Sequence, residues 1–570
     1  MGNSNDGLKA RTFDAIVIGS GMSGGWAAKE LCEKGLKTLV LERGRDVVHL
    51  KDYPTTNMQP WEFEHRLQVP EAIREANPVV SKCYNFREDA MQFFVKDNEH
   101  PYIQEKPFDW IRGYQVGGKS LLWARMTQRW SDYDYEGPAR DGYAVDWPIR
   151  YKDIAPWYSH VEKFAGISGN KDGLDTLPDG EFLPALELSC VENYFKDYVS
   201  KNYKDRHVIY SRCAHLTEPK QIHLDQGRAQ CQNRNLCQRG CPFGGYFAAN
   251  STTIPWAMKT GNMTLRPFSV VHSIIYDEKK GKATGVRVID AHSKETIDYY
   301  ARIIFVNAAA TNTNLILLNS KSGRFPNGLG NDSGVLGKYF AFHNYRARIS
   351  AEYDGFPDSI TAGGRPNGGA YLPRFRNVHK QETDFLRGYA SGFSAGRYGG
   401  SKADGFGTTL KDNLAKKDPG PWHVGSQMMG ETIPKETNFL SLDPSQKDEW
   451  GIPQLRFSID YDQNDEKMIK DFFEQFSEMY TKAGFTNIKT SDSHQAPGLD
   501  IHEMGGARMG KDPKTSVLNK WNQVRACENV FVTDGACMSS TSTQNPSLTY
   551  MALTARACDY AVSQMKKNEL

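Results

Sequence analysis

The chain has 570 residues, enough for a sizeable hydrophobic core and, at about 150 residues per domain, for three or four domains. Lysine and arginine total 70 and aspartate and glutamate total 68, so the net charge of +2 excludes a protein that binds nucleic acid through a strong overall positive charge. Hydrophobic residues make up 39%, and no apolar run is long enough to predict a membrane span. We therefore expect a globular protein without a transmembrane helix.

The N-terminal segment has none of the features of a secretory signal. Residues 1–14, MGNSNDGLKARTFD, contain no apolar core and no twin arginine. The Met-Gly start is shared with myristoylated proteins, but Asp6 stands where that motif has Ser or Thr. We expect an ordinary leader that does not by itself export the chain.

Residues 13–43 predict a βαβ unit, because a glycine turn and an amphipathic helical stretch separate two short apolar runs. The turn reads G-x-G-x-x-G, in which the glycines allow a tight turn, close approach to a pyrophosphate, and helix-on-strand packing. The acidic residue that ends the second run would bind a ribose. The candidate dinucleotide-binding residues are Gly19, Gly21, Ser23, Gly24 and Glu42. The unit predicts NAD or FAD without deciding between them, and a glycine turn without a ligand is the alternative.

The following segments alternate between irregular and regular patterns. Residues 46–109 have no clear period, and we expect long loops and short helices over a cleft. A second glycine turn lies at 116–118. Residues 263–290 predict two or three antiparallel strands around a KKGK turn, and residues 303–310 predict a buried strand followed by a helix.

Between about 345 and 490, strand-like runs and one helical pattern predict an antiparallel sheet backed by helices. The C-terminal segment predicts a strand, a turn and a closing helix. No internal repeat is present.

Three of the ten cysteines lie within eleven positions, in CQNRNLCQRGCPFGG. Thiolates are the usual ligands of iron–sulfur clusters, and the glycine pair allows backbone amides to approach the sulfurs. Three ligands suit a three-iron cluster, whereas structural zinc needs a fourth, from Cys213, Cys190 or His223. Core cysteines without metal are a further alternative, and disulfides would leave an odd thiol. The candidate metal ligands are Cys231, Cys237 and Cys241; we expect the other seven cysteines to be buried and unreactive.

Three C-terminal segments decide the family that the chain resembles: HEMGGARMG at 502–510, FVTDGACM at 531–538 and STQNPSLTYMALTAR at 542–556. In this order they resemble the glucose-methanol-choline (GMC) oxidoreductases. The likeness extends to the N-terminal βαβ unit, to VGGKSLLW, to NAAATNTNLILLNS and to GVLGKYFAFH at 334–343. It implies an α/β fold with a Rossmann-type FAD-binding domain and a substrate domain built on an antiparallel sheet.

The resemblance also implies roles for individual residues. His502 would take the proton of a substrate hydroxyl as hydride leaves carbon for flavin N5, and Asn545 would hydrogen-bond the same oxygen. Further implied FAD contacts are Gly117, Gly118, Ser120, Val271, Asp534 and Gly535. The loop KSLLWAR has no histidine for a covalent flavin bond, so we expect non-covalent FAD, and Trp123 stands where relatives often have Asn or His. We expect His494 at the surface.

The order of these motifs revises the number of domains to two interleaved ones. The FAD-binding domain is expected to comprise residues 10–45, 110–130, 225–345, with an iron–sulfur loop at 225–250, and 495–570. The substrate-binding domain and cleft-covering segments are expected to comprise residues 46–109, 131–224 and 346–494.

The cysteine spacing resembles that of bacterial FAD and [3Fe-4S] sugar dehydrogenases. Among these relatives, the C-terminal segments HEMGGARMG and SSTSTQNPSLTYMALTAR resemble glucoside 3-dehydrogenases most. This implies oxidation of a secondary hydroxyl, with the C3 hydroxyl of glucose or a glucoside as best candidate. Electrons would leave through the cluster to a cytochrome c or quinone. Because the chain has no export signal, we expect a small partner subunit with a twin-arginine signal to carry it to the periplasm; a cytoplasmic enzyme is the alternative.

Three other functions remain open at this point. An oxygen-using sugar oxidase has the same fold and needs no electron relay. A dehydrogenase of another substrate would act on glucose C1, gluconate, fructose or sorbitol. A flavin electron-transfer module without substrate chemistry is an alternative of another class.

Overall fold

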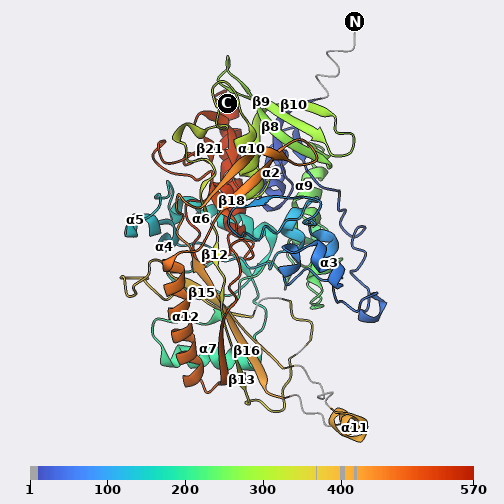
Figure 1. The fold of residues 1–570 in the computed structure, drawn as a ribbon, viewed down its shortest axis with the longest axis vertical. Helices are drawn as coiled ribbons and strands as arrows, with labels where there is room; N and C mark the ends of the chain where they lie inside the picture. Colours follow the sequence, from blue (N-terminus) through green and yellow to red (C-terminus); the bar gives the residue numbers. More distant parts are fainter. Residues whose placement is uncertain (1–10, 362, 367–368, 398–404, 416–419) are drawn as a thin grey trace.

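The structure is a computed structural model that describes residues 11–361, 363–366, 369–397, 405–415 and 420–570. Most of the expected N-terminal leader, residues 1–10, lies outside this range. Figure 1 shows the elements β8, β9, β10 and α2 toward one end of the long axis, and β13, β16, α7 and α12 toward the other. In the described ranges, no helix is long and apolar enough to cross a bilayer.

The first sheet is built on the predicted βαβ unit. Strand β1 (Thr12–Ile18) pairs in parallel with β2 (Thr38–Leu41), and helix α2 (Met22–Glu33) connects them. The sheet has the order β21-β22-β10-β1-β2-β7. The other strands in this order are β7 (Met263–Arg266), β10 (Thr296–Val306), β21 (Gln523–Val524) and β22 (Cys527–Val532). Two further strands, β8 (Ser269–Asp277) and β9 (Lys282–Asp290), complete the eight-stranded sheet, because β9 pairs with β10. The pairs from β22 to β7 are all parallel, as in a Rossmann-type sheet.

The segment 263–290 contains three strands, but only two of them form the expected antiparallel hairpin. β8 (Ser269–Asp277) and β9 (Lys282–Asp290) pair around the KKGK turn. β7 instead runs parallel to β2 at the edge of the Rossmann sheet. The physical reason is that helix α9 (Thr253–Lys259) precedes it and packs on α2, so β7 enters the sheet at the end of a helical crossover.

The predicted strand-to-helix segment and the closing helix are both present. β10 leads into α10 (Ala310–Asn319). The last strand, β22, is followed by the short turn η8 (Gly535–Cys537) and helix α13 (Ser547–Lys566), which packs against α2. Residues 46–109 form loops with short helices, such as α3 (Glu71–Ala76), as expected.

A second sheet is antiparallel and has the order β19-β13-β16-β15-β14-β6, with β12 also paired to β16. Its strands are β6 (Ile209–Tyr210), β12 (His343–Asn344), β13 (Ala347–Tyr353), β14 (Ala370–Leu372), β15 (Tyr389–Gly396), β16 (Trp422–Glu431) and β19 (Thr486–Asp492). Helices α7 (Cys190–Asn202) and α12 (Gln463–Lys482) cover one face. Along β13, Ala347, Ile349 and Ala351 are buried, whereas Arg348 and Ser350 between them are exposed. One face is therefore apolar core, and the other is open.

The strands between 345 and 490 do not all belong to this sheet, contrary to the expectation of a single one. β17 (Phe439–Lys447) and β18 (Pro453–Ser458) join β3 (Ile103–Gln104), β11 (Lys338–Ala341) and β20 (Met504–Gly506) in a five-stranded sheet. The chain leaves the seven-stranded sheet after Glu431, and Pro434 follows, which has no N–H to donate to a ladder. The expected α/β fold class is confirmed, with a Rossmann-type sheet and a separate antiparallel sheet. The exact division into two interleaved domains stays a prediction.

Candidate active site

A cavity of about 1300 Å³ lies between the carboxyl ends of the Rossmann strands and the open face of the antiparallel sheet. Gly19 follows β1, Glu42 follows β2, Asn307 follows β10 and Asp534 follows β22, and all four line the cavity. In parallel sheets, ligands bind at this edge. The cavity brings together eleven predicted residues: Gly19, Gly21, Ser23, Glu42, Gly118, Ser120, Val271, His502, Asp534, Gly535 and Asn545.

The two predicted glycines that do not line the cavity, Gly24 and Gly117, support it from behind. A Cβ atom at Gly24 would lie 2.0 Å from the carbonyl oxygen of Gly19, so only glycine lets α2 pack on the turn. At Gly21, a Cβ atom would have only the Gly117 carbonyl oxygen within reach, at 4.0 Å. The backbone at Gly21 is therefore open to a ligand in the cavity, as a pyrophosphate site requires.

The carboxylate of Glu42 is tied to the glycine turn by a residue that the sequence did not single out. Ser20 donates to Glu42 from its backbone nitrogen, at 3.2 Å, and from its hydroxyl, at 2.5 Å. Gly44 donates its N–H at 2.9 Å. Burial raises the pKa of Glu42, and these three donors oppose that rise. Glu42 is thus held at the mouth of the turn, where a ribose hydroxyl would meet it.

The second glycine turn is docked on the first. The N–H of Gly117 donates to the hydroxyl of Ser20, at 3.1 Å, and Gly117 has a φ of 92° that favours glycine. Ser120 donates its hydroxyl to the Gly117 carbonyl and accepts the N–H of Ala249, at 2.5 and 2.9 Å. The hydroxyl of Ser120 therefore already has two protein partners that hold the turn against the cavity.

The residues after β10 and β22 present polar atoms without protein partners to the cavity. Asp534 is satisfied: it accepts from the hydroxyl of Thr313 at 2.5 Å and from the N–H of Ala536 at 3.0 Å, and burial raises its pKa to about 6. In contrast, three buried side-chain atoms lack a hydrogen-bond partner: Asn307 Nδ2, Thr311 Oγ1 and Asn545 Oδ1. Buried polar groups are normally hydrogen-bonded, so these atoms fit a polar ligand that fills the cavity.

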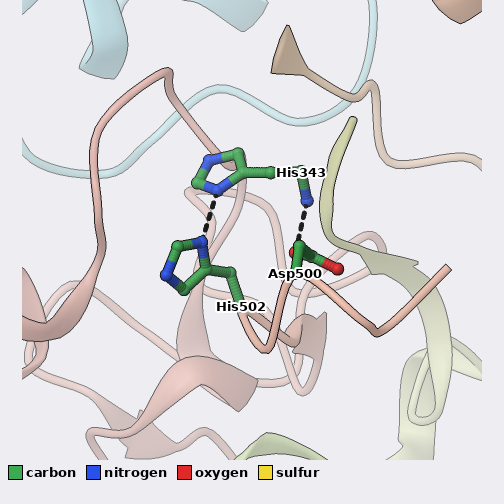
Figure 2. Close-up of side chains that lie close together, drawn as sticks. All are labelled: His343, Asp500 and His502. Atoms are coloured by element: carbon green, nitrogen blue, oxygen red, sulfur yellow. Dashed lines mark hydrogen bonds between the residues drawn. The ribbon is translucent and has the colours of Figure 1, made fainter. Parts of the chain in front are cut away.

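The predicted catalytic pair is formed. Nδ2 of Asn545 lies 3.2 Å from Nε2 of His502, and both side chains line the cavity. Figure 2 shows that the other side of the His502 ring meets His343, with the two Nδ1 atoms 2.8 Å apart. His343 and Asp500 were missed as site residues, although His343 is the last residue of the segment GVLGKYFAFH that carried the family resemblance.

His343 is completely buried and contacts two other segments, one at 500–502 and one at 541–542. Its Nε2 lies 3.0 Å from the carbonyl oxygens of Thr541 and Ser542. Its backbone N–H donates to Oδ2 of Asp500 at 2.9 Å. Burial lowers the pKa of His343 to about 4 and raises the pKa of Asp500 to about 7. The histidine is therefore neutral near pH 7.

Burial also lowers the pKa of His502 well below its usual value, with smaller contributions from His343 and Lys119. A neutral imidazole whose Nε2 points into the cavity can accept a proton from a ligand hydroxyl. Lys119 forms an ion pair with Glu503, with Nζ 2.8 Å from Oε2, so its positive charge is balanced beside the site. The arrangement can serve as a general base.

The face of the antiparallel sheet that lines the cavity carries small and hydrogen-bonding residues. The β-sheet register places Arg348 opposite both Gln427 and Ser491, and Ser350 opposite both Gly425 and Lys489. On the next strand, Gly392 and Ser394 face the same way, because they pair with Gln427 and Gly425. All these residues line the cavity. They form a polar face, named here the polar sheet floor, opposite the dinucleotide-binding turns.

The three clustered cysteines lie in a loop outside the cavity lining, and all three are half-buried thiols without disulfides. Cys237 and Cys241 both raise the pKa of Cys231, in addition to the larger effect of burial, so the three thiols lie in one neighbourhood. The N–H of Gly245 donates to Sγ of Cys241 at 3.4 Å, which is the backbone approach that the glycine pair predicted.

One alternative for this loop is a structural zinc site. Within the described residues, the three Sγ atoms do not all lie within 4.8 Å of one another. Four ligands about 2.3 Å from a zinc ion would be about 3.8 Å apart, so the described thiols are not arranged as a closed zinc site, and zinc stays an alternative for this loop. His223 has no free ring nitrogen: Nδ1 accepts the N–H of Lys220 at 2.9 Å, and Nε2 lies 3.0 Å from the Lys163 carbonyl.

The remaining predictions concern isolated residues. Six of the other seven cysteines are buried, as expected, and Cys190 is half-buried. His494 is exposed at the surface, as expected. Trp123 lines the cavity and donates its Nε1–H to the carbonyl of Phe247 at 2.9 Å.

Comparison with known proteins now decides the family. The GMC oxidoreductase profiles match residues 13–344 and 434–554, which is most of the chain. The chain belongs to the GMC oxidoreductase family. As a GMC oxidoreductase it binds FAD, and the open glycine turn, Glu42 and the unpaired polar atoms of the cavity fit that cofactor.

Individual relatives cover nearly the whole GMC chain. The 2-methyl-1,2-propanediol dehydrogenase of Mycolicibacterium austroafricanum is 28% identical over 96% of this chain and 94% of its own length. The fructose dehydrogenase large subunit of Gluconobacter japonicus is 25% identical and covers 99% of this chain and 100% of its own. A formate oxidase structure from Aspergillus oryzae shares the fold, with a TM-score of 0.60, 13% identity, and coverage of 98% of this chain and 99% of its own. The chain is thus an FAD-dependent enzyme similar to sugar and alcohol dehydrogenases.

Proposed function

We propose that this enzyme is a dehydrogenase that oxidises a secondary hydroxyl of a sugar to a ketone, with the C3 hydroxyl of glucose or a glucoside as the first candidate. The observation that carries the proposal is the position of Nε2 of His502 and Nδ2 of Asn545, 3.2 Å apart in a cavity whose opposite wall is the polar sheet floor. FAD bound in the cavity supplies the acceptor for the hydride that leaves the carbinol carbon.

The two side chains act on the substrate oxygen. The hydroxyl donates its hydrogen to Nε2 of His502, which takes the proton as the carbonyl forms. Asn545 donates from Nδ2 to the same oxygen, and its unpaired Oδ1 accepts from a neighbouring hydroxyl of the substrate. A vicinal diol, as found in every pyranose, supplies both groups.

The polar sheet floor supports a polyhydroxylated substrate. Ser350, Ser394 and Gln427 each supply donors and acceptors, while Gly392 and Gly425 leave room for a ring to approach the backbone. A substrate with several hydroxyl groups would satisfy more of these donors and acceptors than a simple alcohol would. The relative named as a fructose dehydrogenase large subunit agrees with a sugar.

The cysteine loop supports electron transfer through a [3Fe-4S] cluster. In such a cluster different iron atoms bind the thiolates, which suits thiols that lie in one neighbourhood but are not arranged as a closed site for one ion. Arg125 connects the loop to the cavity: it lines the cavity and stacks on Tyr246, with its guanidinium carbon 4.7 Å from the ring centroid. Burial lowers the pKa of Arg125, but Cys237 and its other neighbours outweigh this effect. Residues Cys231, Cys237 and Cys241 would hold the cluster.

The proposal extends to partners and location. A cluster that passes single electrons suits an acceptor such as a cytochrome c. The name of the Gluconobacter relative indicates that it works with a second subunit. We propose a small subunit with a twin-arginine signal that carries the folded enzyme to the periplasm. Cell fractionation with and without that subunit tests this, and cytoplasmic enzyme in both cases would contradict it.

An anaerobic titration of the purified enzyme with a panel of glucose, methyl glucosides, fructose, gluconate and sorbitol tests the main proposal. We expect glucosides to bleach the flavin absorbance and to yield a 3-keto product, identified by NMR. Electron paramagnetic resonance of the oxidised enzyme should show a three-iron signal, supported by iron and sulfide analysis. No bleaching by any sugar would refute the proposal that the substrate is a sugar. Bleaching by gluconate or sorbitol alone would mean that this compound, and not a glucoside, is the substrate.

The rival functions give different results in the same preparation. An oxidase would produce peroxide in air at the full turnover rate without an added acceptor. A flavin electron-transfer module would exchange electrons with dyes but would show no sugar-dependent bleaching. The geometry of the His502 and Asn545 pair favours the dehydrogenase or oxidase over this module, because both side chains face the same open volume.

A further inference from the structure

We propose that His343 is a positioning residue: it holds His502 in the tautomer whose Nε2 carries no hydrogen, and it fixes His502 relative to the loop that carries Asn545. Nε2 can then accept the substrate proton once the substrate hydroxyl takes the place of the Asn545 amide on that nitrogen. The inference uses the catalytic role given to His502 above, and its structural part can be measured without any substrate.

Two backbone carbonyl oxygens lie beside the side chain of His343. Nε2 of His343 lies 3.0 Å from the backbone oxygens of Thr541 and Ser542. A carbonyl oxygen only accepts hydrogen bonds, so Nε2 of His343 carries the hydrogen. In a neutral imidazole the other nitrogen is then an acceptor. Nδ1 of His343 therefore presents a lone pair to His502.

The protonation of His343 also determines which nitrogen of His502 carries a hydrogen. Nδ1 of His502 lies 2.8 Å from Nδ1 of His343, and one of the two atoms must donate. Because His343 can only accept there, His502 carries its hydrogen on Nδ1. Its Nε2 is then unprotonated and accepts the amide hydrogen of Asn545 at 3.2 Å. Each of the four contacts agrees with this single arrangement of hydrogens.

His343 also links the two halves of the catalytic pair in space. Thr541 and Ser542 lie in the loop just before Asn545, and Ser542 has a φ of 62°, which a non-glycine residue rarely adopts. The backbone N–H of His343 is held by Asp500, two residues before His502. One buried side chain, on strand β12, thus contacts the segments that carry both catalytic residues. Figure 2 shows the contact with His502. A displacement of about 1 Å between such groups can lower a rate about 100-fold.

His343, Asp500 and His502 have ligand atoms within 4.8 Å of one another, which raises the alternative of a metal site. A metal would require both Nδ1 lone pairs to point at the ion. Here the two nitrogens are 2.8 Å apart and share a hydrogen, and Oδ1 and Oδ2 of Asp500 accept backbone N–H groups of Gly498 and His343. We therefore assign the cluster to hydrogen bonding, and the experiment below includes a test with a chelator.

Two variants separate the role of the hydrogen bonds from that of the side-chain volume. His343→Leu fills the space but removes both the acceptor and the donor. His343→Gln keeps one acceptor and one donor on a planar group. We expect kcat with a bleaching sugar to fall about 100-fold in His343→Leu and less than about fivefold in His343→Gln, with KM changed less than threefold in both. FAD content and melting temperature identify a variant that has lost its fold.

The tautomer itself is measured in the oxidised holoenzyme without substrate, by nitrogen NMR of protein labelled in the histidine rings. The His502 signals are assigned from a His502→Ala spectrum. In the wild type we expect protonated Nδ1 and unprotonated Nε2 on His502. In His343→Leu we expect this preference to be lost, while His343→Gln retains it.

The outcomes distinguish failure of this inference from failure of the proposed function. If no sugar is oxidised but the tautomer is as stated, the function is wrong and the positioning role stands. Wild-type kcat in His343→Leu, or a His502 that carries its hydrogen on Nε2 in the wild type, would overturn the inference. Loss of activity with a chelator and recovery with a divalent metal would also overturn it, in favour of a metal site.

Discussion

The histidine site and the cysteine loop place reactive groups close together by opposite means. His502 is held from one side by His343 and from the other by Asn545, so its orientation follows from hydrogen bonds within the chain. Cys231, Cys237 and Cys241 have no such bonds to one another among the described contacts, and their thiols are half-buried. The first site is therefore held in place by the folded chain, whereas the described contacts do not link the three thiols of the second site to one another.

The local backbone shows the same difference. The histidine site is built on strand β12 and on segments packed against it, whereas the cysteine loop includes Asn233 and Asn235 with positive φ angles of 50° and 52°. The cysteine loop has its own anchors: Thr56 donates its hydroxyl to the Gly240 carbonyl at 2.8 Å, and Arg239 donates to Asp89 at 2.8 Å. The described hydrogen bonds of the histidine site involve other residues. Damage to one site should therefore leave the other intact, and the predictions below test that independence.

The largest effect is expected for His502→Ala. Removal of the general base should lower kcat about 1000-fold, within the usual range for such groups. FAD content and the cluster signal in electron paramagnetic resonance should be unchanged, because Cys231, Cys237 and Cys241 lie outside the cavity lining. The matched control is His494→Ala, since His494 is an exposed histidine eight residues earlier. A rate within tenfold of the wild type would show that another group takes the proton.

Cys237→Ser tests the role of the cysteine loop. We expect loss of the three-iron signal and at least a tenfold slower reduction of cytochrome c, because the relay between FAD and the acceptor is incomplete. The anaerobic rate of flavin bleaching by sugar should stay within threefold of the wild type. Cys190→Ser is the control, because Cys190 is also half-buried but begins helix α7, away from the loop. Unchanged cytochrome reduction would mean that electrons leave directly from the flavin.

Asn545→Ala is expected to have an intermediate effect that is confined to the histidine site. The lost hydrogen bond to the reacting oxygen is worth about 1.5 to 3 kcal/mol, or about 10- to 150-fold in kcat. Stopped-flow bleaching of the flavin by the sugar measures this step alone. A weaker cluster signal in Asn545→Ala would contradict the independence of the histidine site and the cysteine loop, because these two regions share no described contact.

The parts of the fold that rest on local sequence could be predicted. The βαβ unit was confirmed because its strand, glycine turn and helix follow one another directly, and Gly24 has a local steric reason to be glycine. The helix at 463–482 was also confirmed from its periodic pattern. The division of the strands between two sheets was not predicted, because the pairing of β17 with β11 depends on residues about 100 positions apart.

The candidate site shows the same limit. His502 and Asn545 were found through motifs, and the structure places them in contact. His343 lies 159 residues before His502 and carries no local signal for a buried imidazole pair. Ser20 was likewise overlooked as the partner of Glu42, because serine in a glycine turn is common and its bond spans 22 residues. Long-range hydrogen bonds, more than residue identities, were what the sequence could not supply.

The smallest effect is expected for the dependence of kcat/KM on pH, which reports the protonation of His502. Burial lowers the pKa of His502, and the nearby positive charge of Lys119 acts in the same direction, so the base stays neutral as the pH falls below 6.5. A histidine with the ordinary pKa of about 6.5 would retain about a tenth of its neutral form at pH 5.5. We instead expect kcat/KM at pH 5.5 to be at least half of its value at pH 7.

Other groups around His502 change charge in or near this window and have to be separated from it. Burial raises the pKa of Asp500 to about 7, and Asp500 faces the backbone of His343. Asp500→Asn removes that titration and keeps an oxygen that can accept the His343 N–H. The other nearby carboxylate, Glu503, forms an ion pair with Lys119. If the acid limb of kcat/KM in Asp500→Asn still lies below pH 5.5, it belongs to His502. A tenfold drop between pH 7 and 5.5 in this variant, with FAD content and melting temperature unchanged, would mean that His502 titrates as an exposed histidine and that burial does not set its pKa.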